Sequence, residues 1–191
     1  MSDELGPEVL IAAYAEGAFP MDVSGRLRWF SPDPRAILPL EAFHAPATLR
    51  QLWRQQRFEI RSDTLFREVM LACASRREGT WISDAIVEAY CKLHEMGRAH
   101  SVEAWREGEL VGGLYGVQLG GAFFGESMFH HRRDASKVAL VALVERLRGG
   151  GFTLLDVQFS TPHLEQFGVV EIPRVAYLRR LKAAIRVSAR W

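Results

Sequence analysis

The sequence predicts an α+β fold in which helices pack on a mixed β-sheet and a small lobe precedes that sheet at the N-terminus. Three observations predict it. Residues 110–124 have the composition of a β-hairpin, residues 134–148 repeat apolar side chains at helical spacing, and residues 152–159 form one more strand pattern. An order of strand, strand, helix and strand is typical of a mixed sheet covered by helices.

The predicted hairpin consists of Leu110–Leu119 and Ala122–Phe124. Both stretches are rich in β-branched and aromatic residues, and Gly120-Gly121 between them supplies the positive φ angles that a tight two-residue turn requires. The second strand continues into the sequence GESMF, where Glu126 and Ser127 lie between large apolar residues. A charge in that setting needs a structural or functional reason.

The helix after the hairpin is expected to begin at Asp134, whose side chain can cap it, and to end at Gly149-Gly150-Gly151. The next strand carries Asp156 and Gln158. Alternate residues of a strand share a face, so these two side chains are expected to lie roughly 7 Å apart on one face. Two interpretations stay open: the strand end emerges into solvent, or its two polar groups join Glu126 in a wet slot cut into the sheet.

The remaining elements follow from apolar periodicity and from Gly and Pro breaks. They are a helix at 7–16, an extended loop at 29–35, a strand at 36–40, a helix at 46–55, a strand at 58–61, helices at 64–75 and 84–96, a strand at 99–105, a short helix ending at Gly168, a strand at 169–172 and a basic terminal helix. We divide the chain into a small lobe of residues 1–60 and a main unit of residues 61–191.

Composition predicts a globular protein, because the chain has 191 residues, is 48% hydrophobic and carries a net charge of +1. Its apolar runs are far shorter than the roughly 20 residues that a membrane span needs, and its N-terminus has no basic and apolar leader. We therefore expect a cytoplasmic protein. Cys73 and Cys91 lie in helical patterns and are expected to be buried free thiols.

Several kinds of chemistry are poorly supported. The histidines are scattered, and His130 and His131 are adjacent rather than four apart, so we expect no metal. Neither a Gly-x-Ser-x-Gly elbow nor a Walker-type phosphate loop is present in the sequence. An acetyltransferase-like (GNAT-like) sheet would offer a glycine-rich turn to coenzyme A, but residues 132–137 contain no glycine. A CoA-dependent N-acyltransferase is therefore disfavoured but stays open as a rival, and we expect no cofactor.

Basic residues gather in two parts of the chain. Arg132, Arg133 and Lys137 follow the hairpin, and the segment after Glu171 carries Arg174, Arg179, Arg180, Lys182, Arg186 and Arg190 without an acid among them. A solvated helix face is the usual meaning of such a run. A patch of one sign beside a pocket is also how a protein holds a phosphate backbone without reading bases.

The chain contains eight longer motifs in a fixed order. They are AYAEGAFPM at Ala13–Met21, WFSPDPRAIL at Trp29–Leu38, EGTWI at Glu78–Ile82, AHSVE at Ala99–Glu103, LVGGLYGV at Leu110–Val117, GESMF at Gly125–Phe129, DASK at Asp134–Lys137 and LLDVQ at Leu154–Gln158. With these motifs the chain resembles the bacterial leucyl/phenylalanyl-tRNA–protein transferases over almost its whole length.

The resemblance implies an enzyme that transfers Leu, Phe and less readily Met from aminoacyl-tRNA to proteins with N-terminal Arg or Lys, which marks them for N-end-rule degradation. It also implies a small N-terminal domain and an acetyltransferase-like C-terminal domain. By position, the family's catalytic pair falls on Asp156 and Gln158 and its site carboxylate on Glu126. The implied substrate-binding residues are Trp81 beside the esterified adenosine, Phe123, Leu114, Leu140, Leu143 and Leu155 around the donor side chain, and Met21 and Ser127.

This sequence departs from the family pattern at two aromatic positions. Met21 stands where some members carry the Trp of a GxFPW motif, and Phe30 stands for the second Trp of WWSPDPR. Stacking of the terminal adenosine at Met21 is therefore expected to be weaker. Candidate contacts to the body of the tRNA are Arg132, Arg133, Lys137, Arg174, Arg179 and Arg180.

Residue chemistry and the resemblance lead to one mechanistic hypothesis. An aminoacyl ester is already activated, so peptide-bond formation needs an uncharged amine held against the ester carbonyl. We expect Gln158 to receive that amine through its side-chain oxygen, and Asp156 to orient the amide and help draw off the proton. A non-catalytic tRNA-binding module stays open as a second rival.

Overall fold

A computed structural model describes residues 5–75 and 79–191 of the chain. Its elements are α1 (Pro7–Ala15), β1 (Phe19–Val23), β2 (Arg26–Phe30), β3 (Arg35–Ile37), α2 (Ala47–Arg54), β4 (Glu59–Ser62), α3 (Phe66–Ala74), α4 (Asp84–Glu95), β5 (Ala99–Arg106), β6 (Glu109–Leu119), β7 (Ala122–His130), α5 (Ala135–Gly149), β8 (Leu154–Gln158), α6 (Pro162–Glu165), β9 (Val170–Ile172) and α7 (Arg174–Ala184). Glu78, the first residue of the EGTWI motif, lies outside the described residues.

The molecule is built on a seven-stranded sheet of order β4-β5-β6-β7-β8-β3-β9. Its neighbouring strands are antiparallel, except that β7 and β8 run parallel. This arrangement confirms the predicted α+β class with a mixed sheet. The parallel pairing covers only Ala122–Phe124 against Leu154–Asp156, and no further described pair joins the two strands beyond it.

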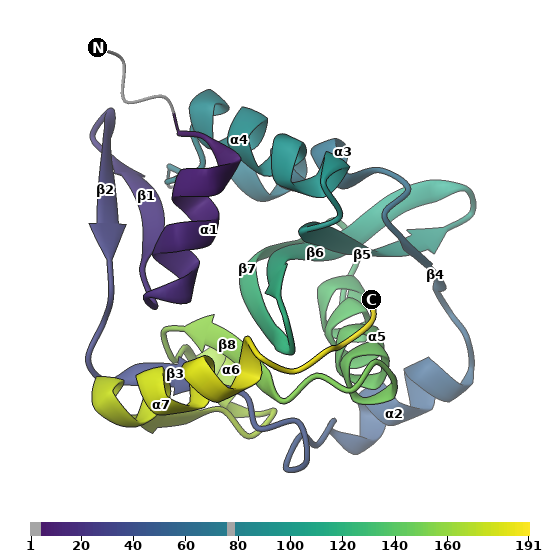
Figure 1. Ribbon diagram of the computed structural model, residues 1–191. Helices are drawn as coiled ribbons and strands as arrows, with labels where there is room; N and C mark the ends of the chain where they lie inside the picture. The colour runs from purple at the N-terminus through teal and green to yellow at the C-terminus, as the bar shows by residue number, and fades with distance from the viewer. Residues whose placement is uncertain (1–4, 76–78) are drawn as a thin grey trace.

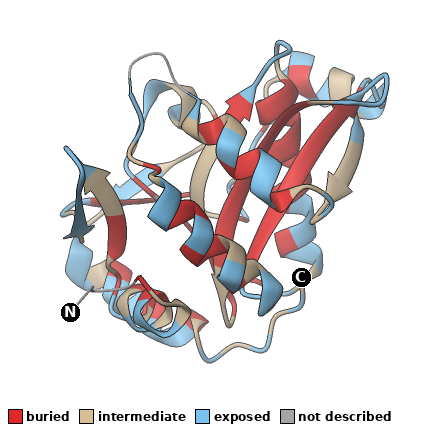
Figure 2. Cartoon of the chain, turned by 90° about the horizontal axis from the view of Figure 1, so that it is seen from above, coloured by how far each residue is buried: buried red, intermediate tan, exposed pale blue. Residues whose placement is uncertain are grey.

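Helices cover both faces of the sheet (Figure 1). One core cluster joins the sheet to α1, α3, α4 and α7, and a second joins it to α2 and α5. Figure 2 shows the central strands buried along most of their length, with helices that are exposed on their outer sides. Helix α5 contributes its whole apolar stripe to the second cluster, as its periodicity predicts.

The hairpin of β6 and β7 is confirmed, but only one of its two turn glycines is left-handed. Gly120 has a φ of +57°, whereas Gly121 keeps a negative φ. The C-terminal segment approaches both glycines closely. A Cβ at Gly120 would lie 2.3 Å from the Ile185 carbonyl oxygen, and the Gly121 N–H donates to the Ala184 carbonyl at 2.9 Å.

Asp134 lies at the predicted start of α5, but the prediction that its side chain caps the helix is wrong. Asp134 does occupy the position before α5, but its φ is +66° and its side chain forms no capping hydrogen bond. The carboxylate instead lies 3.1 Å from Lys137 Nζ, in an ion pair along the first turn. The end of α5 at Gly149 is as expected, since Gly151 follows in the left-handed region with a φ of +78°.

The N-terminal part forms its own small sheet. Among the described strands, β1 and β2 pair only with each other, while β3 already belongs to the large sheet, between β8 and β9. The division into residues 1–60 and 61–191 stays a prediction. Cys73 is buried as expected, Cys91 is only half-buried, and no disulfide joins these two described residues. Across residues 5–75 and 79–191 we find no helix with the length and apolar character to span a bilayer.

Candidate active site

A cavity of about 490 Å³ opens where β7 and β8 diverge, and we call it the β7–β8 cavity. Its wall is largely apolar, with polar groups from both strands and the segment after β8. The lining residues used below are Leu114, Leu140, Leu143, Leu155, Trp81, Glu126, Ser127, Gln158 and His163. Two depressions of about 640 and 580 Å³ lie between α2 and α5, but their charged side chains are exposed, so the β7–β8 cavity is the better candidate.

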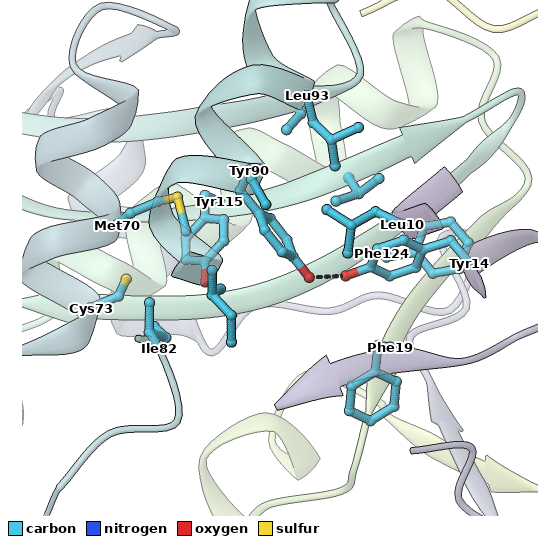
Figure 3. Close-up of a cluster of buried hydrophobic side chains, with 14 of the residues drawn as sticks. Leu10, Tyr14, Phe19, Met70, Cys73, Ile82, Tyr90, Leu93, Tyr115 and Phe124 are labelled. Carbon is cyan, nitrogen blue, oxygen red and sulfur yellow. Dashed lines mark hydrogen bonds between the residues drawn. The ribbon is translucent and has the colours of Figure 1, made fainter. Parts of the chain in front are cut away.

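Glu126 is the charged group that the sequence singled out, and it lies in this cavity wall. Its Oε1 accepts hydrogen bonds from the Tyr14 hydroxyl at 2.7 Å and from Gln158 Nε2 at 3.0 Å, and the Tyr90 hydroxyl lies 3.5 Å from Oε2. The two tyrosine oxygens are 2.5 Å apart, and Figure 3 shows them meeting between α1 and α4.

These surroundings change the acidity of Glu126. Its side chain opens onto the cavity over part of its surface, but protein surrounds the rest. Burial raises the pKa of Glu126 to about 8, the Tyr14 hydrogen bond opposes that shift, and the charge of Asp156 adds to it. The carboxyl group therefore changes its protonation state close to neutral pH.

Gln158 ends β8 in an uncommon backbone conformation. Its φ is +59°, which costs a residue with a side chain about 1–2 kcal/mol. The Gln158 N–H donates to Asp156 Oδ1 at 2.9 Å, and this bond holds the turn. Because its Nε2 donates to Glu126, the side-chain oxygen of Gln158 is left to accept from another group.

Asp156 does not open into the β7–β8 cavity, so the prediction that it shares a cavity with Gln158 is wrong. Its side chain is fully buried and receives Arg35 Nε at 2.9 Å, Arg35 Nη2 at 2.6 Å and the Tyr177 hydroxyl at 2.7 Å. Arg35 also donates to the Gly17 carbonyl at 3.0 Å. The left-handed turn at Gln158 separates the two side chains, because it breaks the strand alternation on which the prediction depended.

The predicted substrate-binding residues divide into two groups. Trp81, Leu114, Ser127, Leu140, Leu143 and Leu155 line the β7–β8 cavity. Phe123 does not: it is fully buried and stacks on Trp191 with ring centroids 5.3 Å apart, because the C-terminal segment covers it. Met21 lies on β1, outside the cavity wall, next to Asp22, whose N–H donates to the Trp81 carbonyl at 3.0 Å.

The predicted tRNA contacts lie on separate elements. Arg132 and Arg133 are exposed just before α5, and Lys137 lies in its first turn. Arg179 and Arg180 are exposed on α7, and Arg174, at the start of α7, donates to the Ser31 carbonyl at 2.8 Å. Their role in binding tRNA stays a prediction.

Sequence reasoning missed five residues that shape the site: Arg35, Tyr14, Tyr90, Tyr177 and His163. Arg35 had a signal, because it belongs to the quoted WFSPDPRAIL motif and a buried arginine requires an acidic partner. The tyrosines lie on helices whose periodicity predicts burial but not a shared carboxylate. His163 lies in the four-residue helix α6, which is too short to show a period.

The raised pKa of Glu126 predicts a specific dependence of stability on pH. The fold favours the neutral carboxyl, so the associated stability is complete below the ordinary value of 4.5 and is lost as pH rises through about 8. Glu126→Gln lacks this titration. Between pH 5 and pH 9 the free energy of unfolding of the unaltered protein is expected to fall by about 4 kcal/mol relative to this variant. Urea unfolding at both pH values measures the difference, and parallel pH dependences would contradict the assignment.

Comparison with known protein families gives two matches that together span nearly the whole chain. The family model described as leucyl/phenylalanyl-tRNA protein transferase matches residues 37–182, and the model of the N-terminal domain of the same family matches residues 3–33. The gap between the two matches, residues 34–36, falls at β3, the first strand of the chain that belongs to the large sheet.

Curated proteins with the same description are similar over full length. The leucyl/phenylalanyl-tRNA–protein transferase of Herpetosiphon aurantiacus is 60% identical over 190 residues, which are 99% of this chain and 99% of that protein. The protein of the same name from Salinibacter ruber is 56% identical over 193 residues, which cover 100% of this chain and 85% of that protein.

Solved structures show more distant similarity. A GCN5-related N-acetyltransferase-like protein from Streptococcus suis has a TM-score of 0.41 and 14% identity, over 86% of this chain and 63% of that one. L-PGS from Bacillus licheniformis has a TM-score of 0.43 and 15% identity, over 83% of this chain and 55% of that one.

Proposed function

Because the chain belongs to the leucyl/phenylalanyl-tRNA protein transferase family, we propose that the aminoacyl group is transferred from tRNA to the acceptor amine in its β7–β8 cavity. The protein moves Leu or Phe, and less readily Met, from aminoacyl-tRNA to the α-amino group of proteins that begin with Arg or Lys, and this marks them for N-end-rule degradation. The observation that carries the proposal is the 3.0 Å contact between Gln158 Nε2 and Glu126 Oε1 in the wall of a largely apolar cavity.

The donor side chain binds the apolar part of the wall. Leu114, Leu140, Leu143 and Leu155 contribute branched aliphatic surface from β6, α5 and β8. A wall of this kind favours Leu, Phe and Met and disfavours polar side chains, which would lose their hydrogen bonds to water there. Trp81, on the same wall, offers an aromatic face to the adenosine that carries the ester.

The acceptor approaches the polar part of the wall. Its α-ammonium group ordinarily has a pKa of about 7.7–8.0, close to the value of about 8 for Glu126, so moving a proton between the two groups is nearly neutral in free energy. Glu126 takes that proton, and the Gln158 side-chain oxygen accepts an N–H of the resulting amine. Until it takes that proton, ionised Glu126 also attracts the positive charge of the acceptor.

Transfer then needs one bond exchange. The amine nitrogen attacks the ester carbonyl carbon, the new C–N bond forms, and the C–O bond to the ribose breaks. The proton that leaves the nitrogen ends on the ribose oxygen, and Glu126 releases to solvent the proton that it took from the ammonium group. Neither a covalent enzyme intermediate nor a cofactor is required. Positioning supplies most of the rate enhancement, because the ester is already activated.

Asp156 acts through Gln158 rather than on the substrate. Its two oxygens are occupied by Arg35, Tyr177 and the Gln158 N–H, so it is poorly arranged to draw off a proton. It is better described as a positioning residue that fixes the backbone from which the Gln158 amide projects. This revises the role that we expected for Asp156 in proton removal.

A transfer assay tests the proposed function. The purified protein is mixed with tRNA charged with labelled leucine and with three peptides that differ only in beginning with Arg, Lys or Ala. Label is expected on the Arg and Lys peptides and not on the Ala peptide. Binding of tRNA without transfer of label would indicate a non-catalytic module, and acyl transfer that requires acetyl-CoA would indicate a CoA-dependent enzyme.

Leu143→Ala is expected to change donor preference. The substitution removes an isopropyl group and enlarges the donor pocket, so kcat/KM for Phe-tRNA relative to Leu-tRNA should rise about tenfold, as expected when an apolar pocket changes by a few carbon atoms. Leu147→Ala is the matched control: Leu147 is buried on the same helix but outside the β7–β8 cavity wall. An equal change of the ratio in both variants would contradict the assignment of the donor pocket.

A further inference from the structure

A second cavity lies beside the first turn of α5, and we call it the basic cavity. Its volume is about 520 Å³, and its wall consists mainly of imidazole and cationic side chains. These are His130, His131, His163, Arg133 and Lys137, with Asp134 between them. The transfer chemistry proposed above uses none of them.

The wall of the basic cavity carries a net positive charge. Asp134 is the one carboxylate among the described residues that line it, and it is already shared between Lys137 Nζ at 3.1 Å and Arg133 Nε at 3.5 Å. Two permanent cations thus face one anion, and the imidazoles add N–H donors without adding negative charge. The ligand that suits such a wall is an anion rich in hydrogen-bond acceptors, which describes a phosphate group.

His163 joins this wall to the candidate active site, because it lines both cavities. Its Nε2 is buried, and no hydrogen-bond partner for it occurs among the described residues. Burial lowers the pKa of His163, and the positive charge of Lys137 lowers it further. A buried polar atom without a hydrogen-bond partner is unfavourable unless a ligand supplies the partner. The buried Nε2 of His163 therefore indicates that a molecule binds beside it.

We propose that the basic cavity binds phosphodiester groups on the 5′ side of the terminal adenosine of the aminoacyl-tRNA. This inference rests on the proposed function, because the ester and its adenosine then occupy the β7–β8 cavity and the single-stranded chain must leave it. The basic cavity lies next to that cavity, since His163 lines both. Contacts to phosphates position a strand without reading its bases, so the same cavity accepts different tRNAs.

The test compares two donors that carry the same ester. Leu-tRNA has phosphates 5′ of its terminal adenosine, and leucyl-adenosine has none. In the double variant Arg133→Gln/Lys137→Gln, the KM for Leu-tRNA relative to that for leucyl-adenosine is expected to rise about five- to tenfold. The slope of log KM for Leu-tRNA against log salt concentration is also expected to fall by about 1.4, which is roughly 0.7 for each lost contact to a single strand.

The control is the double variant Arg67→Gln/Arg106→Gln, which removes the same net charge from exposed positions outside both cavities. An equal rise of the KM ratio in both double variants, or no rise in either, overturns the inference. Inhibition by coenzyme A that the Arg133→Gln/Lys137→Gln variant relieves would assign the cavity to a cofactor phosphate and overturn it as well. If the unaltered protein transfers leucine from neither donor, the proposed function fails, and this inference fails with it.

Discussion

Replacing Gln158 by alanine is expected to lower kcat for leucine transfer by about 10²- to 10³-fold. The variant loses the oxygen that accepts the amine N–H and also the Nε2 donor that fixes Glu126 Oε1 at 3.0 Å. The donor pocket is built from other residues, so KM for Leu-tRNA should change only a few-fold. Steady-state kinetics with an Arg-starting peptide separate the two constants.

Gln118→Ala is the matched control for this experiment. Gln118 is partly buried at the end of β6 and donates to the carbonyls of Gly120 and Ala189 at 3.2 and 3.3 Å, but it lies outside the β7–β8 cavity wall. Its loss removes an amide of the same size without touching the site. If Gln158→Ala retains a kcat within a few-fold of the unaltered protein, the assigned role of the amide is wrong.

The parts of the fold that sequence predicted well are those with strong local signals. The β6–β7 hairpin, helix α5 and strand β8 each show a clear period, the hairpin turns and α5 ends at glycines, and all three elements occur in the structure. The family resemblance, read from motifs, is confirmed by the two family matches and by relatives that are 60% and 56% identical. Local periodicity predicts which residues lie on one face of an element, and it holds as long as the backbone stays regular, as it does along α5 but not at Gln158.

The parts that sequence could not predict depend on contacts between distant segments. Arg35 and Asp156 are 121 positions apart in the chain, and they meet only because β3 pairs beside β8. Phe123 has a position typical of a pocket residue, but Trp191, in the C-terminal segment, stacks on it and covers it. The left-handed turn at Gln158 has no sequence signal either, since it depends on a hydrogen bond to a side chain two residues earlier.

The Asp156–Arg35 pair also changes what its mutation should do. If Asp156 served only to orient the Gln158 amide, Asp156→Ala would reduce turnover and leave the fold intact. The structure instead predicts a loss of about 3–5 kcal/mol in the free energy of unfolding, because the variant leaves a fully buried guanidinium without its anion. The total free energy of unfolding of a natural domain is only about 5–15 kcal/mol, so this loss is large.

Urea unfolding of Asp156→Ala and of Asp156→Ala/Arg35→Met tests this expectation and separates stability from catalysis. The second substitution removes the unpaired buried charge, and apolar replacements of buried ion pairs are often neutral or stabilising, so the double variant should be the more stable of the two. Transfer should stay low in both, because the Gln158 N–H has lost its acceptor.

Glu88→Ala is the control. It breaks the exposed Arg67–Glu88 pair and should change stability little. If Asp156→Ala unfolds at the same urea concentration as the unaltered protein, the pair does not stabilise the fold. If adding Arg35→Met restores transfer, Asp156 acts only through stability.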